Sequence, residues 1–245
     1  MTHGPAREQR RTRHGGGALI RYVRAGGEGV PDREELTVDD AAGTVRAWRS
    51  LAAAAGRFGG KLECETLTAL SAAADRARAL GVGAGRRGPT TGAAEEVVTL
   101  DGLTVEVGQE TDLPEAWGVL VSRLRALLDE TVGMPVAAVG LEVATADKTA
   151  RLVHLGTESL DLDLGALALS ASLWGPDLAR LGRWRLPEPP RAEQPVSAGP
   201  GWSLPLDFGT GFEPGPGRRL VAQATFVAFD GPLPVPVAVT AVERF

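Results

Sequence analysis

The chain has 245 residues, of which 43% are hydrophobic and 23% are charged, and its formal net charge is -5. This composition is typical of a globular protein, and the length is sufficient for two domains. The acidic balance argues against general binding to nucleic acid, and the single cysteine, Cys64, excludes an intramolecular disulfide.

The first 17 residues, "MTHGPAREQRRTRHGGG", are rich in arginine and glycine and have no apolar periodicity. We predict that residues 1–17 form a disordered basic tail. The tail lacks the apolar region of a secretory signal, and no apolar run in the sequence reaches the length of about 18 residues that a membrane helix requires. We therefore expect a cytoplasmic protein without a membrane partner.

The next segments predict antiparallel strands followed by a helix. Residues 18–24 ("ALIRYVR"), 35–39 ("ELTVD") and 44–49 ("TVRAWR") carry the β-branched and aromatic residues of strands. The glycine-rich "GRFGG" that follows is assigned to no element. Apolar residues then recur every three or four positions between Lys61 and Leu80, which predicts a helix. Residues 81–95 have no periodicity and are expected to form a loop.

A hairpin and a second helix are predicted next. Asp101-Gly102 separates two strand-like runs in "EVVTLDGLTVEV", and this dipeptide favours a tight type I′ turn. A helix is expected to begin at Asp112, with Glu115 completing a capping box. Its predicted apolar stripe comprises Leu113, Ala116, Trp117, Leu120, Val121, Leu124, Leu127 and Leu128. We expect the helix to end at Gly133.

From Met134 onward, about seven short alternating runs, among them "SLDLDLG" and "LALSASLWG", are separated by Gly and Pro turns, as in an immunoglobulin-like sandwich. The segment 186–201 ("LPEPPRAEQPVSAGPG") is interpreted as too rich in proline to be a strand. The predicted fold class is thus an α+β N-terminal domain of antiparallel strands with two helices, residues 18–133. An all-β immunoglobulin-like sandwich, residues 134–245, follows it.

No catalytic or metal-binding constellation is recognisable in the sequence. "HGGG" at residues 14–17 resembles an esterase oxyanion motif, but the G-x-S-x-G nucleophile elbow is absent. None of the three histidines belongs to a metal-type pair. Asp161 and Asp163 share one face of a predicted strand, and we interpret them as solvated. We therefore expect no catalytic residue, no metal, no cofactor and no enzymatic activity.

The glycine break in "RYVRAGGEG" has two interpretations. It can be an ordinary hairpin connection, with glycine providing positive φ. Alternatively, Gly26 and Gly27 let a partner approach the backbone while Tyr22, Arg24 and Glu28 supply contacts. The residue types favour the first interpretation, and the second makes these five residues the candidate partner-binding site.

The order of these segments resembles the emfourin family over residues 18–132. The resemblance rests on "RYVRAGG", "ELTVDD", a helix, "VVTLDGLTVEV" and the final helix "DLPEAWGVLVSRLRALLDE". It implies inhibition of a thermolysin-like metalloprotease by a protein that itself carries no metal. The run "TVRAWRS", the insertion at residues 81–95 and the appended sandwich depart from the family pattern.

Three hypotheses of function follow. The first is a non-catalytic protein-binding protein whose partner is a metalloprotease. The second is an interaction or scaffold module without inhibitory activity, and the third is an enzyme. The sequence predicts a protein partner and no nucleic acid.

Overall fold

The computed structural model describes residues 19–26, 32–80, 95–107, 113–144, 149–185, 195–207 and 215–245. The protein is mostly β-structure with two helices. Its elements, in chain order, are β1 (Leu19–Gly26), β2 (Asp32–Asp39), β3 (Thr44–Arg49), β4 (Leu51–Ala52), β5 (Ala54–Lys61), α1 (Cys64–Leu80), β6 (Glu95–Leu100), β7 (Leu103–Val107), α2 (Glu115–Thr131), β8 (Pro135–Ala144), β9 (Thr149–Gly156), β10 (Leu160–Trp174), β11 (Arg180–Arg185), β12 (Val196–Ala198), β13 (Ser203–Asp207), β14 (Arg219–Asp230) and β15 (Leu233–Arg244).

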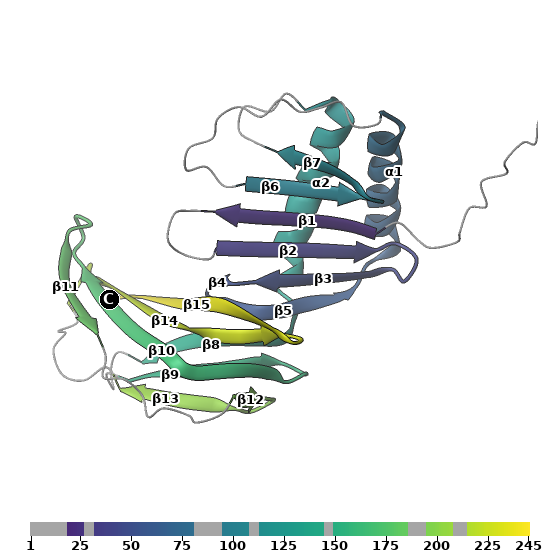
Figure 1. Cartoon of the computed structure of the whole chain (residues 1–245). Coiled ribbons are helices and arrows are strands. Elements are labelled where there is room, and N and C mark those ends of the chain that lie inside the picture. The colour runs from purple at the N-terminus through teal and green to yellow at the C-terminus, as the bar shows by residue number, and fades with distance from the viewer. Residues whose placement is uncertain are drawn as a thin grey trace, which may run out of the picture.

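The strands form two sheets (Figure 1). Sheet A has nine strands in the order β13-β9-β8-β5-β3-β2-β1-β6-β7, and all its neighbours are antiparallel. Sheet B has the order β11-β10-β14-β15-β4, and β12 pairs with β10. The short pairing of β15 with β4 is parallel. Predicted antiparallel strands are therefore confirmed.

Both helices pack on one face of sheet A. Alternate residues of its strands, such as Tyr22, Leu36 and Val98, are buried against apolar residues of α1 and α2. Trp117 and Leu124 belong to the predicted stripe of α2 and are at most 1% exposed. We call this cluster the helix core. It forms because the two-residue period of the strands and the 3.6-residue period of the helices each place one apolar face inward.

A second cluster, the intersheet core, lies between sheet B and the opposite face of sheet A. Leucines of β10 and alternate residues of β14 face Val139 of β8 and Leu152 of β9. Trp48 of β3 and Ala55 of β5 also belong to it, although Ala47 and Phe58 of the same strands belong to the helix core. Strands β3 and β5 therefore contribute to both cores from opposite faces.

The two segments predicted as domains share sheet A. Strand β8, which follows residue 133, pairs with β5 of the preceding segment from Ala54↔Gly140 to Phe58↔Pro135. The backbone hydrogen bonds of the sheet therefore continue across the predicted boundary.

The segment "GRFGG", for which the sequence predicted no element, forms part of a strand. These residues lie within β5, between β3 and β8. Gly56 and Gly59 have φ values of 133° and 151°, and a Cβ at either position would overlap a backbone oxygen of the neighbouring strand. Glycine here permits close approach between strands, so its usual meaning as a break does not apply. The first helix accordingly begins at Cys64.

The predicted start of the second helix is also wrong. The helix begins at Glu115 with Pro114 at its N-cap, and no side chain caps it. Asp112 lies outside the described residues. Proline favours a helix start through its fixed φ, and this local effect replaces the predicted capping box. The Asp101-Gly102 turn is confirmed, with φ values of 50° and 83°.

The strands after residue 134 differ from the prediction in three places. The runs "SLDLDLG" and "LALSASLWG" form one strand, β10, with a register irregularity between Asp163 and Ala168. Strand β11 was not predicted, and β12 lies within the proline-rich segment that was interpreted as containing no strand. Strand β12 has three residues and begins directly after Pro195. Because this proline lies outside the strand, it removes none of the strand's hydrogen bonds. The predicted tail and the loop at 81–94 lie outside the described residues.

Candidate functional site

The structure describes three of the five residues predicted to contact a partner. Tyr22 has 0% of its surface exposed and lies in the helix core, so its side chain is unavailable to a partner. Gly26 ends β1 and pairs with Asp32. Gly27 and Glu28 lie outside the described residues. The alternation of β1 places Tyr22 on the face toward the helices, a direction that residue type alone does not indicate.

Arg24 takes part in a row of charges across three strands. It pairs with Glu34 of β2, which is itself paired with Arg49 of β3. Glu34 is only 2% exposed, so two guanidinium groups compensate one buried carboxylate. This row links β1, β2 and β3 near the Gly26 end of β1. Arg24 is committed to Glu34 through one guanidinium nitrogen, and its partly exposed side chain keeps its other N–H donors for a partner.

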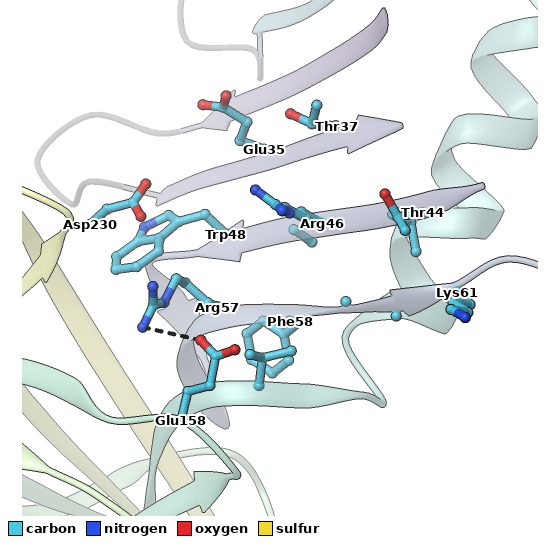
Figure 2. Close-up of a pocket in the computed structure, with 15 residues that line it drawn as sticks. Glu35, Thr37, Thr44, Arg46, Trp48, Arg57, Phe58, Lys61, Glu158 and Asp230 are labelled. Carbon is cyan, nitrogen blue, oxygen red and sulfur yellow. Dashed lines mark ion pairs between the residues drawn. The ribbon is translucent and has the colours of Figure 1, made fainter. Parts of the chain in front are cut away.

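The structure contains a cleft with a volume of about 660 Å³ at the junction of the two sheets (Figure 2). Its floor is the face of β2, β3 and β5 that points away from the helices. Its walls come from the turn after β9 and the turn between β14 and β15. The polar and aromatic side chains that line it include Glu35, Thr37, Thr44, Arg46, Trp48, Arg57, Lys61, Glu158 and Asp230.

Glu35 is held at the cleft margin by two arginines. Arg21 donates to its carboxylate at 2.6 and 2.9 Å, and Arg33 donates at 2.8 Å. Partial burial by itself would raise the pKa of Glu35, but the hydrogen bonds and charges of Arg21 and Arg33 outweigh burial, and the pKa is lowered. The glutamate is therefore committed to this cluster and remains ionised at neutral pH.

The remaining charges are distributed along the cleft. Arg46 and Lys61 are exposed and form no ion pair with any described residue. Asp230 lies beside Trp48 at the other end, where Glu158 approaches Arg57 at 3.9 Å (Figure 2). The cleft therefore presents free cations along the floor and carboxylates on the walls.

Two buried N–H groups at the cleft have no hydrogen-bond partner among the described residues. They are Nε1 of Trp48, whose side chain is 7% exposed, and Nε of Arg57. Another nitrogen of Arg57, Nη2, donates to the carbonyl oxygen of Ser159 at 2.8 Å, which fixes the position of the guanidinium. A buried donor without a partner costs about 1–3 kcal/mol. Both nitrogens lie beneath the surface of the cleft, and movement of the surrounding side chains would let each donate to an acceptor that enters it.

Gly59 and Gly60 keep the floor free of side chains. Gly59 has a φ of 151°, and a Cβ there would overlap the carbonyl oxygen of Val45. On β5, the floor between Arg57 and Lys61 is therefore bare backbone. A chain-like ligand can lie on such a floor and meet the charged groups at its edges.

The arrangement suits recognition of a ligand that carries both acceptors and donors. Arg46, Lys61 and the two unpaired N–H groups can bind carbonyl or carboxylate oxygens, and Asp230 can accept from N–H groups.

Within the described ranges, no group of three or more His, Cys, Asp or Glu side chains could hold a metal ion. His154 is 9% exposed, and its Nε2 lies 2.7 Å from the carbonyl oxygen of Glu158.

Sequence reasoning missed the cleft. Arg46 and Trp48 alternate with the buried Val45 and Ala47 in "TVRAWR", so a two-sided strand was recognisable. No local signal shows that the face of Arg46 remains open beside the turn that carries Asp230. That juxtaposition arises from the packing of sheet B on sheet A.

No family model, curated protein or solved structure matches this chain. Among the described residues, no helix is long and apolar enough to span a membrane.

Proposed function

We propose that this chain is a non-catalytic protein-binding protein that holds an extended segment of its partner in the cleft. The observation that supports this proposal most directly is the pair of buried, unpaired donors, Trp48 Nε1 and Arg57 Nε. A peptide backbone supplies carbonyl acceptors for these donors and N–H groups for Asp230. The bare floor at Gly59 leaves room for a main chain.

A thermolysin-like metalloprotease is the partner class that the emfourin resemblance implies. The order of β1, β2, α1, the β6–β7 hairpin and α2 supports this narrower proposal, since it is the order of segments on which the resemblance rests. The alternative is an interaction or scaffold module without inhibitory activity, and an enzyme is the third hypothesis.

We also propose a cytoplasmic location for the protein and an immunoglobulin-like relationship for residues 134–245. Two sheets around the intersheet core support the latter.

The first experiment measures inhibition of a purified thermolysin-like metalloprotease by the full chain. We expect Trp48→Phe to raise the inhibition constant about 2- to 10-fold, since it preserves an aromatic ring and removes one hydrogen-bond donor. A double variant, Arg46→Ala with Lys61→Ala, should weaken inhibition further. Arg76→Ala with Arg123→Ala removes the same charge from exposed helix positions and should have no effect.

A second double variant, Gly26→Ala with Gly27→Ala, distinguishes the cleft from the β1–β2 connection. Loss of inhibition in this variant alone would move the contact to the connection. An unmodified chain that does not inhibit would exclude the inhibitor hypothesis for that enzyme. Co-purification from a native extract then tests the broader proposal, because a partner retained equally by the cleft variants and the control would not bind in the cleft.

A further inference from the structure

The outer face of sheet B carries a row of basic residues at the end near the β10–β11 turn. Trp174 of β10 pairs with Arg180 of β11 on one side and with Arg219 of β14 on the other. Arg219 pairs in turn with Arg244 of β15. Neighbouring strands are about 4.8 Å apart, so the row extends over roughly 15 Å. Arg183 is exposed in the adjacent row, opposite Ser172.

These four arginines have no ion pair or hydrogen bond with any described residue. Arg219 and Arg244 are directly opposite each other, and like charges in such cross-strand pairs are destabilising. The chain as a whole is acidic, with a net charge of -5, whereas these four arginines lie together at one end of sheet B. Folding within the described part of the chain provides no compensation for this repulsion, whereas an anionic partner would.

Two leucines project beside the same row. Leu178 lies in the β10–β11 turn with a φ of 65° and is 60% exposed, and Leu181 is 52% exposed. Positive φ is unfavourable for a bulky side chain, so this position costs stability in the free protein. Figure 1 shows the turn projecting from the end of sheet B, away from the helices. Leu178, which lies in this turn, is therefore placed to insert into an apolar layer, and the exposed Leu181 follows it in β11.

We propose that this basic end of sheet B, formed by Leu178, Arg180, Leu181, Arg183, Arg219 and Arg244, binds the surface of a membrane that contains anionic lipid. The guanidinium groups would bind lipid phosphates, for which their fork geometry is well suited. The leucines would enter the boundary between headgroups and acyl chains, as apolar side chains of interfacial proteins do.

A lipid surface fits the leucines better than an acidic protein does. Leucine is under-represented among protein-interface hot spots, and a protruding tip needs a matching pocket in a protein but only a deformable layer in a membrane. Ionic screening over about 8–10 Å limits the repulsion from acidic residues elsewhere in the chain. The sequence predicted no membrane partner because it contains no long apolar segment. A membrane-binding surface assembled from several strands of a sheet does not need such a segment, so the sequence pattern does not indicate it.

The test is co-sedimentation of the full chain with vesicles of phosphatidylcholine alone or mixed with phosphatidylglycerol. We expect binding only to the mixed vesicles, and we expect it to weaken as salt is added. Arg219→Ala with Arg244→Ala should lower the partition coefficient about 25-fold, since each basic residue near an anionic surface contributes about fivefold, or about 1 kcal/mol. The control pair Arg76→Ala with Arg123→Ala removes equal charge and should change binding less than twofold.

Leu178→Gly separates binding from folding. Glycine readily adopts positive φ, so this variant should be at least as stable as the unmodified chain while it binds the mixed vesicles several-fold more weakly. The proposal is overturned if the mixed vesicles sediment no protein, or if the control pair loses as much binding as the Arg219/Arg244 pair. It is also overturned if polyglutamate or a single-stranded oligonucleotide binds as tightly and is insensitive to Leu178→Gly.

Discussion

Tyr22 carries the only phenol in the chain, and none of its side chain is exposed. Burial, together with the nearby charge of Glu96, raises its pKa from 10.0 to about 12. The folded state therefore favours the protonated phenol more strongly than the unfolded state does. This contribution to stability is complete below about pH 10 and is lost as the pH rises through about 12.

We accordingly expect the free energy of unfolding to fall by about 2–3 kcal/mol between about pH 10 and 12, the equivalent of two pKa units. Tyr22→Phe should remove this component. Its cost at neutral pH should be small because the buried hydroxyl makes no hydrogen bond of good geometry, although Glu96 and Arg125 lie close enough to affect its pKa. Denaturant titrations at several pH values measure the effect, and ultraviolet absorbance follows the single phenol directly. An unchanged alkaline slope in Tyr22→Phe would contradict this assignment.

Gly59 offers a second prediction for a single residue. Gly59→Ala should destabilise the protein by about 2–4 kcal/mol, because backbone strain of about 1–3 kcal/mol adds to a collision with Val45. Gly102→Ala is the matched control, since Gly102 also has positive φ but a Cβ there would meet nothing within 4 Å. Thermal and denaturant unfolding should show the larger loss for Gly59→Ala, and equal losses would mean that β3 and β5 separate easily.

At the scale of elements, α2 shows which features of a helix apolar periodicity predicts and which it does not. Its predicted stripe is buried from Trp117 to Leu128, whereas its predicted first turn is displaced to Glu115. The stripe is set by repeated apolar contacts along the whole helix. The terminus depends on one local competition between a side-chain cap and a proline, which is why helix ends are predicted less reliably.

The stripe leads to a prediction for α2. Leu124→Ala should cost about 2–5 kcal/mol, because Leu124 is 0% exposed and its removal leaves a cavity in the helix core. Val119→Ala, on the same helix, should cost less than about 1 kcal/mol, because Val119 is 37% exposed. Urea titration of both variants provides the comparison. Similar small losses would show that the helix core tolerates the cavity by collapsing.

At the scale of the whole molecule, β3 and β5 connect the two cores. Each strand has residues in the helix core on one face and in the intersheet core on the other, and β5 also pairs with β8. Loss of either core therefore exposes one face of the strands that support the other. This arrangement favours cooperative unfolding despite the length of the chain.

We predict a single unfolding transition. Leu124→Ala in the helix core and Phe226→Ala in the intersheet core should both lower the midpoint of that same transition. Circular dichroism should follow the secondary structure, and tryptophan fluorescence should follow both cores, since Trp117 and Trp48 report on one each. Two separated transitions, each sensitive to only one variant, would indicate independently stable domains.

The sequence by itself determined most strands, both helices and the Asp101-Gly102 turn, because two-residue and 3.6-residue apolar periods and turn chemistry are local properties. Tertiary structure alone decided that "GRFGG" is a central strand, that Tyr22 is buried and that Trp48, Arg57 and Asp230 meet at one cleft. The physical reason is that strand pairing and sheet packing join residues far apart in the chain. The face on which a side chain lies, and what covers that face, are consequences of those distant contacts.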